Sequence, residues 1–276
     1  MTNIFVHNRL FFITAILIHS LLISLSLNAS ETVNFSVKNK LLMPKDCFTQ
    51  GFIIESDLIY LSCGMYNRSR VIKMNMSGKV LATQHLPKKI FAEGLTLFNN
   101  TLYVLTWKNH IAYTLNKDTL AIEKQIPISG EGWGLSSRGD EFLLSDGSNA
   151  IHSFDSNTFT KRRSYFLKDG NKNKLNHLNE LENIKNLLFA NQWKTRKIHL
   201  IPKSFGQNIQ PIAEINISDE KAFSEELKRG VLNGIAYDEK TQCLWITGKN
   251  WNKAYALSLE TTPAIKKLSG SSFDCR

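Results

Sequence analysis

The sequence is poor in the residues and motifs that mark several common protein classes. It holds only 15 glycines and 6 prolines among 276 residues, which excludes a collagen-like or low-complexity chain. Beyond residue 27 no apolar stretch is long enough to cross a bilayer, so a polytopic membrane protein is excluded. Phosphate-binding loops, Gly-x-Ser-x-Gly elbows and paired-histidine metal motifs are also missing. The composition is typical of one large globular domain or two small ones.

Cysteine is scarce, and its four positions have neither metal-finger nor redox spacing. This argues against zinc and thioredoxin-like chemistry. An even number of cysteines predicts disulfides if the chain is exported, with three possible connectivities. Cys47 with Cys63 would staple one hairpin, and Cys243 with Cys275 would clamp the C-terminus, but the other pairings stay open.

One long apolar stretch does occur, at residues 10–27, preceded by Arg9 and followed by small residues before Glu31. This pattern predicts a secretory signal peptide over residues 1–30, with cleavage near Ala29 or Ser30 and export of residues 31–276 to the periplasm or the medium. The alternative is an uncleaved anchor helix, because 18 residues is long for a signal core. His19 and several hydroxyl residues make the stretch a poor permanent span, so we expect no stable membrane insertion after cleavage.

Acidic residues are outnumbered, 24 against 34 Lys and Arg, for a formal net charge of +10. The basic residues are dispersed, and the densest run, Lys161-Arg162-Arg163, is not interleaved with aromatic residues. We therefore interpret the charge as a solvated basic surface and expect no nucleic-acid partner.

The chain repeats itself at intervals typical of propeller blades. A glycine followed by an apolar residue recurs at Gly51, Gly94, Gly134 and Gly234, and Leu181 stands at the matching place between the last two. Repeats of about 40 to 50 residues without a helical stripe indicate blades of a β-propeller.

Each repeat carries the same series of strands. Strongly apolar second strands are predicted at residues 58–62, 102–107, 141–146, 187–191 and 244–249, and alternating third strands at 71–74, 111–115, 151–154, 198–201 and 254–257. The fifth repeat lacks a fourth strand, which residues 33–37 could supply beside 254–257. We therefore predict an all-β fold, a single five-bladed β-propeller over residues 31–276 closed by its N-terminal strand. Residues 219–227 are predicted to form a short surface helix.

Five residues precede the repeated position, and four of them are polar or acidic, where a packed propeller axis would carry small apolar ones. In chain order they are Gln50, Glu93, Trp133, Glu180 and Asn233. The ends of the second strands add tryptophans and a lysine at Trp107, Trp193 and Lys249. Their convergence at one mouth predicts a pocket for a small polar group. The alternative is that these groups are buried polar residues without a chemical role.

Nine short segments in order resemble the plant- and bacterial-type glutaminyl-peptide cyclotransferases, also called glutamine cyclotransferases. One of them is Gly130-Glu131-Gly132-Trp133-Gly134-Leu135, and together they occupy residues 48–51, 91–96, 105–108, 130–135, 145–148, 178–182, 191–193, 232–237 and 247–251. The resemblance covers nearly the whole mature chain. It implies an exported five-bladed propeller that works without a metal or other cofactor. Its partners would be peptides or proteins with an N-terminal glutamine, which it converts to pyroglutamate with release of ammonia. The insertion before Asn179 and the four cysteines depart from the family pattern.

The chemistry of this cyclisation needs one carboxyl group that can carry a proton from the attacking amine to the leaving nitrogen. Glu93 is the predicted catalytic residue, because it stands on the axial ring and is followed by Gly94; Glu180, Glu182 and then Glu131 are the alternatives. By resemblance, Gln50, Asn179 and Lys249 would hold the amide and carbonyl oxygens of the substrate. The predicted pocket walls are Trp107, Trp133 and Trp193, together with Phe48 and Phe91.

Two functions follow for this chain. The first is an aminoacyltransferase, a glutaminyl-peptide cyclotransferase acting as a monomer. The competing one is a non-catalytic exported propeller that binds peptide ends or sugars in the same pocket.

Overall fold

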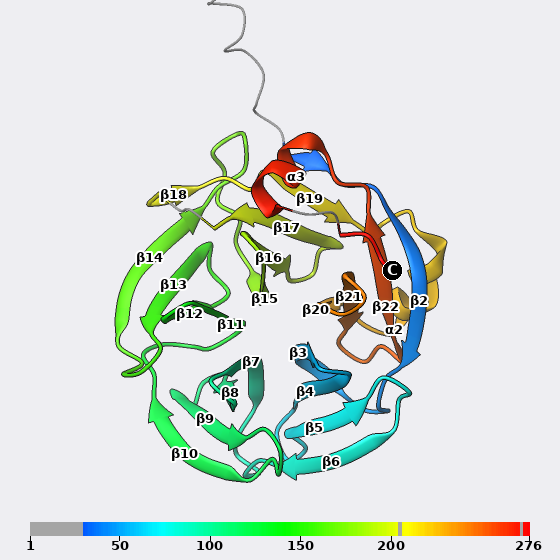
Figure 1. The fold of residues 1–276 in the computed structure, drawn as a ribbon. Helices are drawn as coiled ribbons and strands as arrows, with labels where there is room; N and C mark the ends of the chain where they lie inside the picture. The colour runs from blue at the N-terminus through cyan, green and yellow to red at the C-terminus, as the bar shows by residue number, and fades with distance from the viewer. Residues whose placement is uncertain (1–29, 204–205, 271–272) are drawn as a thin grey trace, which may run out of the picture.

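The computed structural model describes residues 30–203, 206–270 and 273–276, so all but one residue of the predicted signal peptide lie outside the described part. Five sheets, antiparallel in their four main strands, stand in a ring with one innermost strand each around a common axis, which confirms the five-bladed propeller (Figure 1). Within the described ranges no helix is both long and apolar enough to cross a membrane.

The first two blades are regular four-stranded sheets. Blade one contains β3 (Phe48–Glu55), β4 (Leu58–Gly64), β5 (Arg70–Asn75) and β6 (Val80–His85). Blade two contains β7 (Ala92–Phe98), β8 (Thr101–Thr106), β9 (Ile111–Asn116) and β10 (Ile122–Pro127). Burial falls from the inner strands to the outer: every residue of β4 after Leu58 is buried, whereas none of β6 is. The apolar second strands and polar fourth strands of the sequence follow from this gradient.

The third and fourth blades each gain a short extra strand. Blade three contains β11 (Leu135–Arg138), β12 (Glu141–Ser145), β13 (Ala150–Asp155), β14 (Lys161–Leu167) and β18 (Asn208–Ile209). Blade four contains β15 (Leu178–Ile184), β16 (Leu187–Gln192), β17 (Lys197–Pro202), β19 (Ala213–Asn216) and β1 (Glu31–Thr32). Both extra strands pair in parallel with their neighbours and cover an outer edge that would otherwise be open.

The fifth blade joins the two ends of the chain. It contains β20 (Leu232–Asp238), β21 (Cys243–Gly248), β22 (Lys253–Leu259) and, from the N-terminus, β2 (Phe35–Leu42). β2 runs antiparallel to β22 with Val37 opposite Leu257, which confirms the predicted closure. The boundaries of the prediction were wrong: the closing strand is longer, and Val33 bonds through its N–H to Glu214 of blade four instead.

Local hydrogen bonds explain the turn between the third and fourth strands of three blades. The side-chain oxygens of Asn75, Asn116 and Asp155 each accept two backbone N–H groups from the residues that follow. These short side chains therefore hold the turn by mimicking a backbone acceptor, as their positions in the sequence predicted.

Three short helical segments lie outside the blades. The predicted helix at 219–227 is a 3-10 turn, η1 (Lys221–Phe223), followed by α2 (Ser224–Arg229). It begins later than predicted because Glu220 caps it, accepting the N–H of Ala222. α3 (Pro263–Ser269), which the sequence analysis did not predict, starts with Thr262 accepting the N–H of Ile265.

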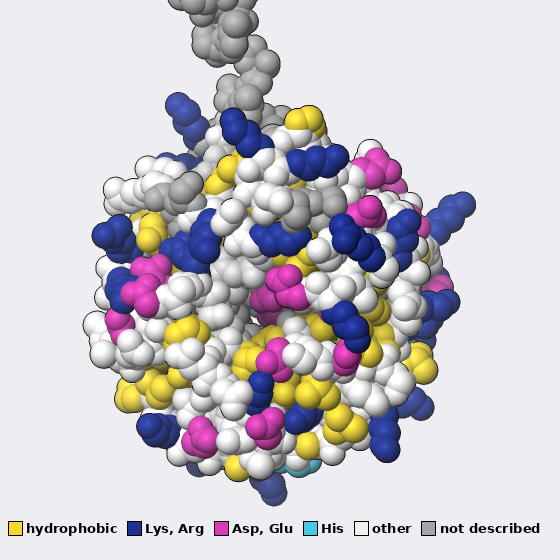
Figure 2. Space-filling view, in the orientation of Figure 1, with side chains coloured by type: hydrophobic (Ala, Val, Ile, Leu, Met, Phe, Trp, Pro, Cys, Tyr) yellow, Lys and Arg dark blue, Asp and Glu magenta, His cyan; other side chains and the backbone are white. Residues whose placement is uncertain are grey.

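All four cysteines form disulfides, Cys47 with Cys63 and Cys243 with Cys275, which are the two local pairings suggested by the sequence. Basic side chains are scattered over the face seen in Figure 2 and form no continuous patch there.

Three of the four repeated glycines, Gly51, Gly94 and Gly134, lie in close contact with the next blade. A side-chain carbon on Gly94 would lie 2.5 Å from the backbone nitrogen of Leu135 in the next blade, so no larger residue fits there. The glycine that defines the repeat in the sequence is therefore a packing requirement of the innermost strands.

Candidate functional site

The nine residues singled out from the sequence line one cavity of about 230 Å³ at one mouth of the propeller. They come from all five blades, at the beginning of innermost strands or just after second strands: Phe48, Gln50, Phe91, Glu93, Trp107, Trp133, Asn179, Trp193 and Lys249. Each blade contributes different side chains at equivalent places, so the ring brings together residues as far apart in the chain as Phe48 and Lys249.

Irregularities in the innermost strands aim these side chains at the axis. In β3, β7, β15 and β20 the pairing with the second strand shifts register next to the repeated position, between Thr49 and Gly51 in β3, for example. A bulge of this kind bends the strand and turns a side chain that regular alternation would place elsewhere. Gln50, Glu93 and Asn179 all stand at such bulges, which the sequence analysis did not identify.

Glu93 places a buried carboxyl group in the cavity lining. Its side chain is only 5 % exposed, and within the described residues its carboxylate makes no hydrogen bond or ion pair. Burial raises the pKa of Glu93 well above its usual value; the charge of Lys249 opposes this rise and that of Glu131 adds to it. A carboxyl group whose pKa is raised in this way holds a proton more readily than a free one, which suits it to carry a proton between two groups.

Lys249 adds a buried basic group to the cavity lining. Its Nζ lies 5.1 Å from the ring centre of Phe48 and 5.8 Å from that of Trp193, so two aromatic faces surround the ammonium group. Burial lowers the pKa of Lys249, while the carboxylates of Glu93 and Glu180 act to raise it. A backbone bridge between Phe48 and Lys249 holds blades one and five together at this point.

Two buried amides face the cavity with unused hydrogen-bonding atoms. Neither Nδ2 nor Oδ1 of Asn179 has a partner within the described chain, and Oε1 of Gln50 has none either. Buried polar atoms are rarely left unpaired, and in a cavity they are available to a bound polar molecule.

Aromatic rings form the walls of the cavity. Phe91 packs edge-on against both Phe48 and Trp107, with ring centres 6.2 and 5.6 Å apart. Trp133 packs edge-on against Trp193 at 5.6 Å. Tyr66, exposed beside Phe91 with ring centres 5.4 Å apart, extends this wall to the surface; nothing in the repeat pattern pointed to it.

The other carboxyl groups considered for catalysis do not line the cavity. Glu180 is buried and accepts the backbone N–H of Phe52, and burial raises its pKa well above the usual value. Burial also raises the pKa of Glu182 to about 8. Glu131 accepts hydrogen bonds from the indole groups of Trp107 and Trp133.

Asn233, predicted on the axial ring, is a structural residue. Its Nδ2 donates to the backbone oxygens of Thr49 and Gln50 and so ties blade five to blade one. The axial ring of the sequence analysis therefore divides: Gln50, Glu93 and Trp133 line the cavity, whereas Glu180 and Asn233 hold its surroundings.

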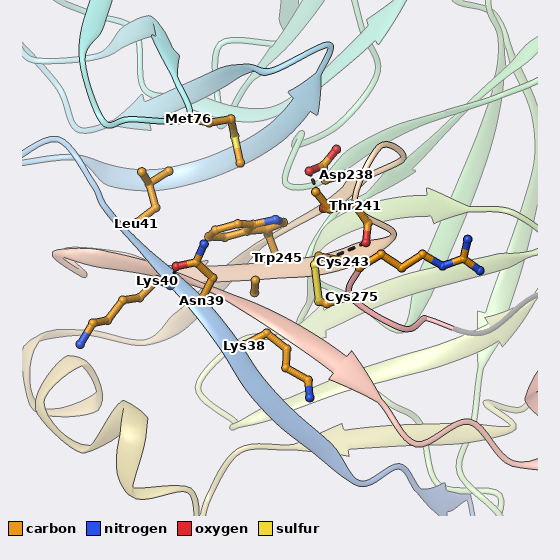
Figure 3. Close-up of a pocket in the computed structure, with 12 residues that line it drawn as sticks. Lys38, Asn39, Lys40, Leu41, Met76, Asp238, Thr241, Cys243, Trp245 and Cys275 are labelled. Atoms are coloured by element: carbon orange, nitrogen blue, oxygen red, sulfur yellow. Dashed lines mark hydrogen bonds between the residues drawn. A yellow bond between two sulfur atoms is a disulfide. The ribbon is translucent and has the colours of Figure 1, made fainter.

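A larger cavity of about 380 Å³ lies beside the disulfide of Cys243 and Cys275 (Figure 3). Trp245, Leu41 and Met76 supply apolar walls, but the side chains of Lys38 and Lys40 extend away from Trp245. The carboxylate of Asp238 accepts a hydrogen bond from the hydroxyl of Thr241. No set of acid and base groups converges there, so this cavity is not the candidate active site. Across the described residues, no three His, Cys, Asp or Glu side chains are grouped to hold a metal ion.

Comparison with known proteins shows what the chain is similar to. The sequence profile of the family described as glutamine cyclotransferase matches residues 12–259. A curated protein of Arabidopsis thaliana, glutaminyl-peptide cyclotransferase, is 31 % identical over 243 residues, covering 87 % of this chain and 76 % of the relative. Among solved structures, the crystal structure of Myxococcus xanthus glutaminyl cyclase superposes with a TM-score of 0.74 at 23 % identity, covering 84 % of this chain and 99 % of that one.

Proposed function

Because the chain belongs to the glutamine cyclotransferase family, we propose that its glutaminyl-peptide cyclotransferase activity is located in the nine-residue cavity, with Glu93 as the proton carrier. The observation that carries this proposal is that the buried carboxyl of Glu93 lines one cavity with buried Lys249, with Asn179, and with Gln50, whose Oε1, like both side-chain atoms of Asn179, has no hydrogen-bond partner among the described residues.

The reaction is an internal acyl transfer. The neutral α-amine of an N-terminal glutamine attacks its own side-chain carbonyl carbon, a new C–N bond closes the five-membered ring, and the bond to the amide nitrogen breaks to release ammonia. One proton must leave the attacking amine and one must reach the departing nitrogen. Glu93 can perform both transfers in turn, which makes the exchange balanced without another reactant.

The remaining polar residues bind the substrate in this proposal. Asn179 and Gln50 donate from their amide nitrogens to the oxygens of the substrate, and the ammonium of Lys249 stabilises the negative charge that develops on the attacked carbonyl oxygen. The cavity excludes bulk water and holds the flexible glutamine side chain folded against its own amine. Orientation of this kind can supply a large part of the rate of an intramolecular reaction. In this proposal the side chains of the cavity and the substrate carry out every step of the reaction.

Export and a monomeric state belong to the same proposal. Two disulfides are compatible with an oxidising compartment, where peptides with a free N-terminal glutamine would be met. Sequencing the N-terminus of the exported protein should place the first residue near Ser30 or Glu31, and an uncleaved Met1 would contradict the signal peptide.

The test is release of ammonia from short peptides that begin with glutamine. Glu93→Gln keeps the size of the side chain but cannot carry a proton, so turnover should fall about 10²–10⁴-fold without a loss of thermal stability. Glu180→Gln is the matched control: Glu180 is equally buried but does not line the cavity, and it should keep near wild-type turnover. Unchanged activity of Glu93→Gln would move the role to another carboxyl. Failure of the wild-type protein on several such peptides would favour a non-catalytic binding protein.

A further inference from the structure

The walls of the cavity form an incomplete ring of aromatic side chains. In order around the cavity, Phe48 contacts Phe91 and Phe91 contacts Trp107, whereas Trp133 contacts Trp193. Two places in this ring have no aromatic contact. At one of them the ammonium of Lys249 lies over both Phe48 and Trp193.

Glu131 occupies the other place. Its Oε2 accepts a hydrogen bond from Nε1 of Trp107 at 2.8 Å and another from Nε1 of Trp133 at 3.1 Å. Both donors therefore share one carboxylate oxygen, and the two halves of the aromatic wall are joined through it. Buried or half-buried indole N–H groups need an acceptor, and a carboxylate is a strong one.

The loop that carries Glu131 is itself attached to the wall. The N–H of Gly132 bonds to the backbone oxygens of Thr106 and Trp107, which fixes the loop against the end of β8. On the outer side, the ammonium of Lys108 lies 4.2 Å from the ring centre of Trp107 and 3.9 Å from Oε1 of Glu131. Both oxygens of the Glu131 carboxylate therefore have partners, the two indoles at Oε2 and Lys108 at Oε1. Glu131 itself does not line the cavity.

We propose that Glu131 is a positioning residue for the cyclisation, because its single carboxylate oxygen locks Trp107 and Trp133 into the orientation that closes the cavity around the substrate. This inference rests on the proposed function for its kinetic consequences, but the locking of the two indoles is a physical property that can be measured without substrate. Glu131 also lies close enough for its charge to raise the pKa of Glu93.

The ring-locking role makes a prediction that a proton-carrying role does not. Glu131→Ala removes the shared acceptor, so both rings gain rotational freedom; KM should rise, kcat should fall, and kcat/KM should drop about 10–100-fold. Glu131→Gln keeps an oxygen that can accept from the indoles and should restore most of that loss. Equal, severe inactivity of Glu131→Gln and Glu131→Ala would overturn positioning and make Glu131 a proton carrier.

The pH profile separates the charge of Glu131 from its hydrogen bonds. Both Glu131 variants remove the negative charge that raises the pKa of Glu93, so the acid limb of kcat/KM should move to lower pH in both. An acid limb that moves in neither variant would show that the charge of Glu131 does not act on Glu93.

Double-mutant cycles test the contact itself. Trp133→Phe removes one donor to Glu131, so its effect and that of Glu131→Ala should not add. Trp193→Phe is the matched control: its indole does not bond to Glu131 and meets it only through the ring contact with Trp133, so its coupling to Glu131→Ala should be smaller than that of Trp133→Phe. Additive effects for Trp133→Phe would contradict the proposal.

Near-ultraviolet circular dichroism of the free protein completes the test. Glu131→Ala should lose indole signal relative to wild type and Glu131→Gln should keep most of it, because fixed rings give a strong signal. An unchanged spectrum for Glu131→Ala would refute the locking. An inactive wild-type protein would refute the proposed function instead, and these spectra would still decide the role of Glu131.

Discussion

Gly147 lies directly against the indole of Trp133, and replacing it with alanine tests whether the position of Trp133 controls the reaction. Gly147 lies in the turn between β12 and β13 with φ of +82°. A side-chain carbon added there would lie 2.6 Å from Cζ2 of Trp133. Carbon atoms in contact are ordinarily about 3.5–4.0 Å apart, so the indole would have to retreat by roughly 1 Å. Its hydrogen bond to Glu131 and its contact with Trp193 oppose that movement.

Two effects of different size follow from Gly147→Ala. The positive φ should cost about 1–2 kcal/mol of the free energy of unfolding, because alanine is strained there. Displacing a wall residue by about 1 Å should lower kcat/KM by up to about 10²-fold, since the substrate would no longer be held in the reactive geometry. Chemical unfolding measures the first effect, and ammonia release from a glutamine-initiated peptide measures the second.

Gly139→Ala is the matched control within the same blade. Gly139 also has a positive φ, +60°, but an added side-chain carbon would meet no atom within 4 Å. This variant should lose stability by a similar amount and keep kcat/KM within about twofold of wild type. Wild-type kcat/KM for Gly147→Ala, or an equal loss of kcat/KM for Gly139→Ala, would refute the argument from the wall.

Two further predictions concern stability. Replacing both Cys47 and Cys63 with alanine should lower the free energy of unfolding by about 3 kcal/mol, because the disulfide closes a loop of 16 residues. If the variant were as much less stable than reduced wild-type protein as it is than oxidised wild-type protein, this origin would be wrong. The raised pKa of Glu182, about 8 against 4.5 unfolded, means that the folded state retains a proton that the unfolded chain has lost, so stability should fall as pH rises through this window. At pH 8.5 the free energy of unfolding of Glu182→Gln should therefore exceed that of wild type by about 1–3 kcal/mol, and at pH 4 the two should be equal. A difference that does not change with pH would exclude this cause.

The repeat in the sequence was sufficient to predict most of the fold. Blade number, the second and third strands and the closing role of the N-terminal segment all depend on local patterns: apolar residues at period two, Asn or Asp at turns, and a glycine where blades meet. Such patterns arise because each blade buries the same surfaces and makes the same turns. The ends of the closing strand were predicted less accurately, because residues 31–33 pair with the edge of β19 in blade four.

Resemblance to a family identified the residues that line the cavity, but the sequence alone did not show how they meet. By itself the sequence determined which residue types stand at the axis, since that follows from counting positions within each repeat. Only the tertiary structure decided that bulges aim Gln50, Glu93 and Asn179 inward, that Glu180 and Asn233 support the backbone, and that Glu131 joins two tryptophans. The physical reason is that a hydrogen bond between blades depends on the angle at which they pack, and a local pattern of residues does not contain that angle.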